Sequence, residues 1–255
     1  MTVTPSGVLP IDKPLGWTSF DVVAVARRSL GAKRVGHGGT LDPLATGVLP
    51  LLVGRATKFA DRLHTASKVY GALVTFGRET ATDDREGAAT RQAEVPALSR
   101  DELDAMLGSF RGPQAQVPPA YAAVKVDGRR AYARARSGET LELAARTVIV
   151  ERLAIATWEP PDLRLLVVCS TGTYIRSLAR DIGRATGSAA HLGGLRRLAV
   201  GALTIDDAQS VELLRGTPDA AWSHLIDADD RILPLAERFR EAPAAELMAT
   251  WGRSE

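Results

Sequence analysis

Runs of apolar residues along the chain suit short strands and short amphipathic helices. Residues 8–11 form an apolar run of strand length that ends at turn-forming residues. Thr18 then precedes a helical pattern, because Asp21 stands at the spacing of a capping box and apolar residues recur on one face as far as Leu30. Gly31 is typical of the position that ends a helix. We therefore predict a strand over 8–11 and a helix that begins after Thr18.

The rest of the chain continues this mixture without a regular alternation of strand and helix. The runs that predict strands are 48–53, 68–76, 122–126, 148–155 and 163–169. The helical patterns are 99–110, which opens with a Ser99–Glu102 capping box, 129–137, which is basic, and 174–185. The glycine-rich residues 31–47 are expected to form a loop. Short helices among strands joined by short turns favour an α+β fold with a mixed, largely antiparallel sheet flanked by helices and loops.

The main domain is predicted to end near residue 215. The residues after it are acidic and polar with scattered Trp and Leu, and at about 40 residues they fall short of an ordinary domain. We therefore expect a main domain over residues 1–215 and a short C-terminal extension over 216–255. The extension should pack on the main domain or be poorly ordered.

The composition fits an ordinary globular protein with a sizeable core, since 45% of the 255 residues are hydrophobic and 24% are charged. The one cysteine, Cys169, lies in an apolar run, which argues against a disulfide framework or a cysteine metal cluster and fits a reducing compartment. Residues 1–6 lack the pattern of a signal peptide, and no apolar stretch reaches the length of about 18 residues that a membrane helix needs. We expect a cytoplasmic protein.

Charge gives a weak indication of the partner. The net charge is +2, from 32 basic and 30 acidic residues, and the pI is near 8.8. Basic residues gather in pairs, several of them beside glycine-rich or proline-rich segments where a phosphate backbone can approach. These pairs include Arg27 with Arg28, Lys33 with Arg34, Arg129 with Arg130, and Arg196 with Arg197. They fit a nucleic-acid partner, and they also fit solvated basic faces.

The stretch from Gly36 to Pro50 carries the most informative chemistry. It holds four glycines, His37 and the dipeptide Asp42-Pro43, which favours an extended or turn conformation at Asp42. One interpretation is a tight loop in which Asp42 caps its own turn. A phosphate-binding loop is poorly supported, since neither the P-loop nor the dinucleotide-binding pattern is present. A His–Asp metal pair needs further ligands, and the four histidines, at 37, 64, 191 and 224, lack metal-site spacing.

As a whole, the stretch 36–50 resembles, nearly letter for letter, the signature loop of the bacterial tRNA pseudouridine-55 synthase family. Other segments are similar to further motifs of that family and follow in the family's order. They are 7–19, 68–70, 117–125, 169–176 and 191–200. The resemblance spans roughly residues 7–210 and implies the pseudouridine-synthase fold. It also implies an isomerase that converts uridine 55, in the T-arm of tRNA, to pseudouridine.

The resemblance assigns catalytic roles to three residues. Asp42 matches the family's essential aspartate, which acts as nucleophile or base. Arg176 matches the arginine that pairs with this carboxylate, and a guanidinium there would hold it ionised and oriented. Tyr70 matches the tyrosine that stacks on the target base and assists proton transfer. A carboxylate beside the sugar can attack C1′, add to C6 of the base or remove the C2′ proton, and the sequence leaves these three routes open.

The resemblance also assigns substrate-binding roles. His37 matches a histidine that helps to extrude the base from its stack, a step that costs a few kcal/mol. Tyr70 and Tyr174 match tyrosines that contact the substrate, and Leu195 matches a residue whose backbone meets the uracil edge. From the residues alone, however, Leu195 fits a core position of a helix. Lys13 is expected to make a structural or backbone contact only.

The implied partner is tRNA, bound through its T-arm by a monomer that needs no cofactor, metal or membrane. Arg129, Arg130, Arg196 and Arg197 then become candidates for holding tRNA phosphates. Residues 1–215 become the catalytic domain, and 216–255 a truncated or absent RNA-binding module. Three alternatives stay open: an RNA-binding protein without catalysis on the same scaffold, a pseudouridine synthase for another RNA, and a nucleotide-dependent enzyme built on the glycine loop.

Overall fold

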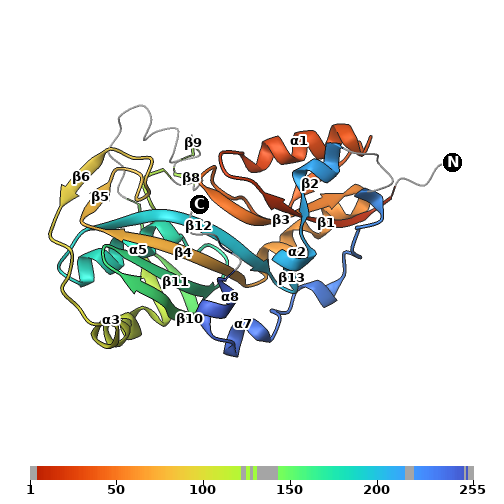
Figure 1. The fold of residues 1–255 in the computed structure, drawn as a ribbon. Helices are drawn as coiled ribbons and strands as arrows, with labels where there is room; N and C mark the ends of the chain where they lie inside the picture. Colours follow the sequence, from red (N-terminus) through yellow and green to blue (C-terminus); the bar gives the residue numbers. More distant parts are fainter. Residues whose placement is uncertain are drawn as a thin grey trace. The chain divides into compact units, whose positions relative to one another are not determined.

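Two strands, β4 (Lys68–Phe76) and β12 (Ala190–Val200), run through both of the units into which the chain folds (Figure 1). The structure is a computed structural model that describes residues 5–121, 125–126, 129–130, 143–215, 221–249 and 251. Unit 1 comprises Met1–Gly71, Leu195–Ala242 and Ala249–Glu255, and unit 2 comprises Ala72–Gly194 and Pro243–Met248. Segments far apart in the sequence therefore share a unit, because the chain leaves unit 1 through β4 and returns to it through β12.

Unit 1 combines a mixed sheet with short helices. Its elements, besides its parts of β4 and β12, are β1 (Gly7–Lys13), α1 (Ser19–Ser29), β2 (Val35–His37), β3 (Ala45–Val53), η1 (Gly54–Phe59), α2 (Ala60–Thr65), β13 (Leu203–Thr204), η3 (Ile205–Asp207), β14 (Gln209–Ser210), η4 (Val211–Arg215), η5 (Asp230–Ile232) and α7 (Arg238–Glu241). The strand order is β14–β1–β3–β12, with β2 on β3 and β13 on β12. β1 runs antiparallel to β3, whereas β12 runs parallel to β3 and β14 parallel to β1.

Helix α1 begins where the sequence predicts. The hydroxyl of Thr18 accepts a hydrogen bond from the N–H of Asp21 at 3.1 Å, and the Asp21 carboxylate accepts one from the N–H of Thr18 at 2.9 Å. This capping box satisfies two N–H groups that have no partner inside the helix. The helix then buries Val22, Val23 and Ala26 on the face predicted from their spacing.

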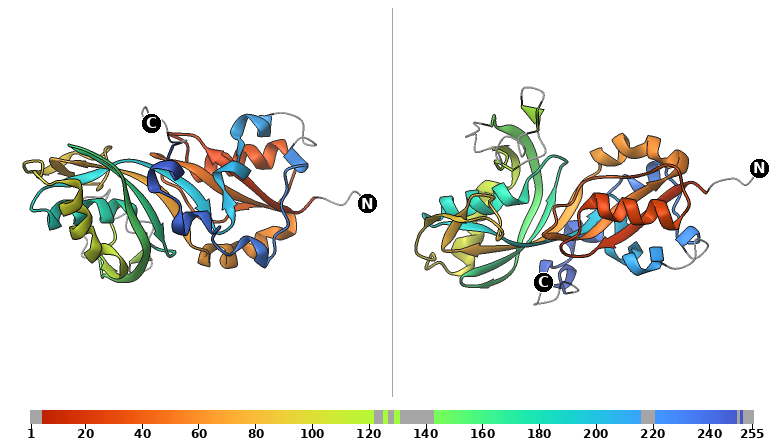
Figure 2. Two further views of the ribbon diagram at one scale, coloured as in Figure 1. Left: turned by 60° about the horizontal axis from the view of Figure 1, so that its bottom comes forward. Right: turned by 90° about the horizontal axis from the view of Figure 1, so that it is seen from above.

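Unit 2 contains a largely antiparallel set of strands with two longer helices. Its elements, besides its parts of β4 and β12, are β5 (Arg78–Thr80), β6 (Ala89–Gln92), α3 (Arg100–Leu107), η2 (Gly108–Phe110), β7 (Gly112–Gln116), β8 (Lys125–Val126), β9 (Arg129–Arg130), β10 (Arg146–Glu159), β11 (Asp162–Cys169), α5 (Ile175–Ala185) and α8 (Ala244–Leu247). β10 pairs antiparallel with β11 and with β7, and the long β10–β11 hairpin is clear in both views of Figure 2. The predicted strand pair at 148–155 and 163–169 is confirmed, as is the α+β class with mixed, largely antiparallel pairing.

Two predicted elements are wrong in part. The loop expected over 31–47 contains strand β2, and β3 already begins at Ala45. Since β2 pairs with the distant residues 51–53, its strand character depends on a partner outside its own stretch of sequence. Arg129 and Arg130, expected to open a basic helix, form strand β9 against β8. Residues 131–137 of that predicted helix, and 122–124 of the strand predicted before it, lie outside the described residues.

Leu195 lies in strand β12 and not in a core helix. Every residue of β12 is buried, so the strand is covered on both faces. A strand of this kind lacks the alternation of apolar and polar residues that marks a strand with one solvated face. Local pattern therefore could not separate it from a buried helix.

The described part of the C-terminal segment belongs to both units. In unit 1, Ile226 and Val8 exchange two backbone hydrogen bonds, with N···O distances of 2.7 and 2.8 Å. Phe239 of α7 is buried in the same unit. Residues Pro243–Met248, which include α8, belong to unit 2. The division into units therefore does not follow chain order at this end of the protein.

A buried carboxylate joins β5, β6 and α5 in unit 2. Glu79 is 4% exposed and accepts hydrogen bonds from two guanidinium nitrogens of Arg184, at 3.0 and 2.7 Å, and from two of Arg91, at 3.1 and 2.7 Å. The Arg184 hydrogen bonds are the largest influence that lowers the pKa of Glu79 to about 2. Two charge-assisted contacts to one buried acceptor thus tie the hairpin to the helix.

This carboxylate should make folding sensitive to acid. The folded-state pKa of Glu79, about 2, lies below its ordinary value of 4.5, so its contribution is complete above the ordinary value and is lost as the pH falls from there toward 2. We expect Glu79→Gln to lower the stability near pH 7 and to reduce the further loss between neutral and acid pH. The measurement is the urea midpoint near pH 7 and near pH 3. Glu86→Gln, which changes an exposed carboxylate of the same hairpin, is the control. Equal pH dependence in the wild type and Glu79→Gln would contradict this role.

Candidate active site

Side chains from β1 and α1 hold the backbone on both sides of Asp42 in unit 1. The hydroxyl of Ser19 accepts a hydrogen bond from the N–H of Leu41 at 2.8 Å and donates one to its carbonyl at 3.1 Å. The ammonium of Lys13 lies 3.5 Å from the carbonyl oxygen of Pro43. Asp42 itself is partly buried. Its carboxylate therefore projects from a loop that is fixed immediately before and immediately after it.

Lys13 has the structural role that the sequence predicts, and it also acts on the Asp42 carboxylate through its charge. Its side chain is fully buried and donates to the carbonyl oxygens of Pro14, at 2.9 Å, and Trp17, at 2.7 Å. Burial lowers the pKa of Lys13 to about 8, and the negative charge of Asp42 is the largest influence that opposes this shift. The ammonium of Lys13 and the carboxylate of Asp42 are therefore close enough to interact electrostatically.

Arg197 is buried beneath the same loop. Its side chain is 1% exposed, and its guanidinium donates to the carbonyl oxygens of Gly39 at 3.0 Å, Thr40 at 3.3 Å and Val48 at 2.7 Å. It also hydrogen-bonds the hydroxyl of Tyr70. The prediction that Arg197 holds a tRNA phosphate is wrong, because a buried guanidinium directed at carbonyl oxygens is not presented to a ligand outside the protein.

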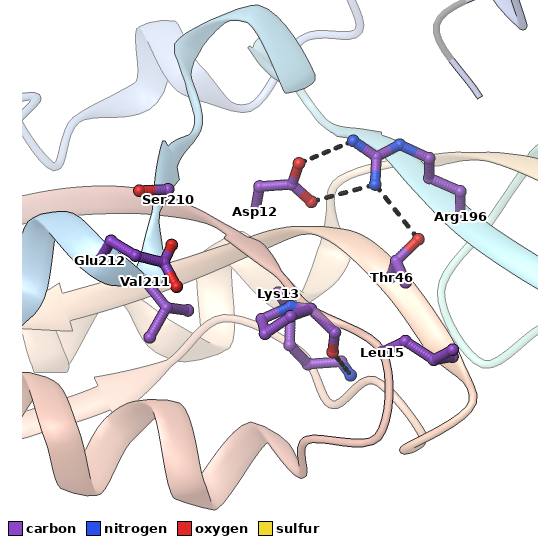
Figure 3. Close-up of a pocket in the computed structure, with 9 residues that line it drawn as sticks. Asp12, Lys13, Leu15, Thr46, Arg196, Ser210, Val211 and Glu212 are labelled. Carbon is purple, nitrogen blue, oxygen red and sulfur yellow. Dashed lines mark hydrogen bonds and ion pairs between the residues drawn. The ribbon is translucent and has the colours of Figure 1, made fainter. Parts of the chain in front are cut away.

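The neighbouring Arg196 is directed elsewhere and is also unsuited to a phosphate. Its guanidinium forms a forked pair with the carboxylate of Asp12, at 3.1 and 2.7 Å, and donates to the Thr46 hydroxyl at 3.2 Å (Figure 3). These groups line a cavity of about 260 Å³ in unit 1, together with Lys13 and Glu212 among others. The prediction for Arg196 is therefore also wrong. The side chains of Arg129 and Arg130 lie outside the described part of the structure.

Strand pairing brings Leu195 next to the Asp42 loop. β12 runs parallel to β3 with Leu195 opposite Ala45, three residues after Asp42. His37, at the end of β2, accepts a hydrogen bond from the N–H of Gly39 at 3.4 Å. Burial lowers the pKa of His37 below its usual value, and the nearby positive charge of Arg197 adds to this, so the neutral imidazole is favoured at neutral pH.

Four of the six predicted site residues, Asp42, Tyr70, His37 and Leu195, thus belong to unit 1. They come from the loop before β3 and from β4, β2 and β12. Arg197 connects the first two of them, since it touches both the Asp42 loop and Tyr70. Long-range strand pairing in one unit is what gathers these segments.

The other two predicted residues, Tyr174 and Arg176, open helix α5 in unit 2. Tyr174 is the N-cap residue, and its backbone N–H and carbonyl both bond the side-chain amide of Gln116, at 2.7 and 3.1 Å. Arg176 is 6% exposed and donates to the carbonyl oxygens of Thr82 and Tyr121, both at 3.2 Å. The helix start is thus held by polar contacts from two other segments of the unit.

An acidic loop between β5 and β6 is a feature that the sequence interpretation missed. The carboxylate of Asp84 lies 3.7 Å from the guanidinium of Arg176, and that of Asp83 lies 2.7 Å from Arg180 on the next turn of α5. Asp83 has a φ of 59°, which a non-glycine residue adopts only under constraint. Burial raises the pKa of Asp83, and Arg180 opposes the shift. The signal in the sequence was the adjacent pair of aspartates, which follows the predicted strand 68–76 after six residues.

Comparison with known proteins identifies the family. The sequence profile described as the N-terminal domain of TruB family pseudouridylate synthases matches residues 27–175. The chain belongs to this family. A protein named tRNA pseudouridine synthase B from Ralstonia nicotianae is 44% identical over 236 residues, which are 91% of this chain and 75% of the relative. Its namesake from Corynebacterium aurimucosum is 43% identical over 250 residues, 96% of this chain and 84% of the relative.

Solved structures agree with this membership of the TruB family. A chain in a structure titled "Crystal Structure of a Cbf5-Nop10-Gar1 Complex" superposes with a TM-score of 0.68 at 28% identity. The match covers 87% of this TruB-family chain and 60% of that chain. The family resemblance and the pseudouridine-synthase fold predicted from the sequence are both confirmed, and the chain is an isomerase of the pseudouridine synthase type.

Among the described residues, no helix is both long enough and apolar enough to cross a membrane. Within the same part of the chain, no group of three or more His, Cys, Asp or Glu side chains is arranged to hold a metal ion.

Proposed function

We propose that this protein isomerises uridine 55, in the T-arm of tRNA, to pseudouridine. The observation that carries the proposal is the Asp42 loop, which has the family's signature sequence and is held on both sides by Ser19, Lys13 and Arg197. A carboxylate fixed in this way retains its position during a reaction, as a nucleophile or base must. A protein that only bound RNA would have no use for a fixed negative charge facing a phosphate-rich ligand.

The proposed reaction breaks the C1′–N1 bond of uridine, turns the base and joins C1′ to C5. The proton on C5 is finally lost and N1 gains one, so the overall change is an isomerisation with no net oxidation or reduction. The Asp42 carboxylate can attack C1′, add to C6 or remove the C2′ proton. Each route needs an ionised carboxylate oxygen at the glycosidic region, and all three stay open.

We assign supporting roles according to the family resemblance. Arg176 is the arginine that keeps the catalytic carboxylate ionised and oriented, and Tyr70 stacks on the target base. His37 assists the extrusion of the base, and a neutral imidazole suits this role because it can fill the vacated space without a charge. Tyr174 and the backbone of Leu195 contact the extruded nucleotide.

We further propose that the protein acts as a monomer in the cytoplasm. The substrate supports the location, since tRNA is made and used there. A single chain carries all six proposed site residues. Shape of the folded T-arm, and not base-by-base reading, is expected to select the substrate, because structured RNA exposes little sequence information in its helices.

The decisive experiment uses purified protein and an unmodified tRNA transcript without any added cofactor. We expect one pseudouridine per transcript at position 55, mapped by a pseudouridine-specific chemical reaction and primer extension. A transcript with cytidine at this position is the matched control and should remain unmodified. Binding of the transcript without any pseudouridine would favour the non-catalytic alternative. Modification of a ribosomal RNA fragment in place of tRNA would favour another RNA specificity.

A further inference from the structure

We propose that Arg197 is a positioning residue that fixes the Asp42 carboxylate and the Tyr70 ring in one arrangement for catalysis. This inference rests on the proposed function, because it assigns Arg197 a role in that reaction. Arg197 was expected to meet the RNA, but its side chain is 1% exposed and points into the protein. Its contacts identify what it does instead.

The guanidinium of Arg197 donates hydrogen bonds to backbone carbonyl groups on both sides of Asp42. Two of its nitrogens bond carbonyl oxygens before the aspartate, those of Gly39 and Thr40, and the third bonds the carbonyl of Val48 after it. One planar group therefore sets the separation between the two ends of the loop. Only a guanidinium has donors in three directions within one rigid plane, so a lysine cannot reproduce this set of three hydrogen bonds.

Arg197 is itself held firmly in place. In the parallel pairing of β12 with β3 it lies opposite Gly47, which has a φ of 98°. A Cβ added at Gly47 would clash with the backbone oxygen of Arg197, so the two backbones approach as closely as a glycine permits. The hydrogen bonds from Arg197 to the loop are therefore made by a residue whose backbone is fixed in the sheet of unit 1.

The same guanidinium reaches the second proposed catalytic group. The hydroxyl of Tyr70 accepts a hydrogen bond from Arg197, so an aromatic ring from β4 and the loop before β3 share one anchor. The positive charge of Arg197 also contributes to the lowered pKa of His37 and of Lys13, so its field reaches these two groups as well as Tyr70. Loss of the fork should thus disturb several groups of the site together.

A role confined to stability predicts a different outcome from a positioning role. If Arg197 only filled the core, a variant that still folds would keep the rate of the chemical step. If it positions Asp42 and Tyr70, the folded variant should bind RNA normally and react slowly, since a misplacement of about 1 Å at a reacting group costs on the order of 100-fold in rate. The rate at saturating RNA and the affinity for RNA therefore separate the two roles.

The test compares Arg197→Lys with Arg196→Lys. Both variants replace a buried arginine of β12 at adjacent positions, but Arg196 bonds Asp12 and Thr46, whereas Arg197 bonds the carbonyl groups that flank Asp42. We expect Arg197→Lys to lower the single-turnover rate on saturating tRNA about 100-fold, with the dissociation constant within about threefold of the wild type. Arg196→Lys should stay within about threefold in both quantities. Hydrogen exchange should be faster at the amides of residues 38–48 in Arg197→Lys alone.

The outcomes separate this inference from the proposed function. If the wild type forms no pseudouridine, the proposed function fails. If the wild type is active and Arg197→Lys reacts as fast as Arg196→Lys, the positioning role fails alone. Should Arg197→Lys not fold, the guanidinium protons of Arg197 are followed by ¹⁵N NMR in the wild type. We expect them to exchange slowly and to keep their chemical shifts when tRNA is added. Large shifts on addition of tRNA would show direct contact with the RNA and would overturn the inference.

Discussion

We expect the replacement of Asp42 by asparagine to abolish pseudouridine formation while tRNA binding stays within a few-fold of the wild type. An amide has the shape of the carboxylate but neither its negative charge nor its basicity, so it can act neither as nucleophile nor as base. The contacts that Ser19 and Lys13 make with the loop go to backbone atoms of Leu41 and Pro43, which the substitution leaves unchanged. We expect the single-turnover rate to fall by more than about 10³-fold, measured at saturating tRNA.

Asp61→Asn is a suitable control for this variant. Asp61 is an exposed aspartate of helix α2 in the same unit, and its replacement should leave rate and affinity unchanged. A large loss of affinity in Asp42→Asn, with a normal rate on bound tRNA, would make Asp42 a binding residue. A normal rate together with normal affinity would remove Asp42 from the reaction and with it the proposed function.

Replacing Arg176 by lysine should also have a large effect, a loss of about 100-fold in the single-turnover rate. The guanidinium of Arg176 bonds the carbonyl oxygens of Thr82 and Tyr121 through two different nitrogens and lies 3.7 Å from Asp84. A single ammonium cannot keep this set of contacts and also direct a charge at a second group.

Arg180→Lys is the matched control in the same helix. Arg180 is similarly buried and pairs with the carboxylate of Asp83, the neighbour of Asp84. This variant should lower the stability of unit 2 without the loss in rate, since the proposed catalytic role belongs to Arg176 alone. Near-normal turnover in Arg176→Lys would remove Arg176 from the site. Equal losses of rate in both variants would indicate a general effect of disturbing α5.

The parts of the fold that the sequence predicted well are those encoded by neighbouring residues. The capping boxes at Thr18 and Ser99 involve groups three positions apart, and both are present in the structure. The strand predicted over 68–76 matches β4, and the helix predicted over 174–185 matches α5 with Tyr174 as its cap. In each case the signal and the structure lie within a few residues of one another.

The errors concern residues whose partners are distant in the sequence. Strand β2 exists because it pairs with residues 51–53, and β9 exists because it pairs with β8. The buried strand β12 was taken for a core helix, since its neighbours in the sheet cover both faces and remove the alternating pattern. Sequence spacing carries no direct record of which strand will become a neighbour.

In the candidate site, too, the sequence did not predict the partners of the adjacent arginines Arg196 and Arg197. A run of two arginines in a family motif reads as a phosphate-binding patch, because charge is visible in the sequence and burial is not. Packing of β12 against β3 turns one guanidinium to Asp12 and the other to the carbonyl groups around Asp42. Local composition drew attention to these residues but assigned them the wrong partner.

By itself the sequence determined the family, the α+β class, and the local caps and turns, and it predicted Asp42 as the reactive carboxylate, because each of these depends on residue types at short and characteristic spacings. Only the tertiary structure decided which segments stand beside that carboxylate and how its loop is held. Residues 19, 37, 42, 70 and 197 are separated by up to 178 positions yet share one unit, since parallel and antiparallel pairing around β3 closes long loops of chain. This strand pairing decides which side chains are buried and where their hydrogen bonds are directed. The hydrogen bonds from Arg197 to the Asp42 loop could therefore be found only in the folded protein.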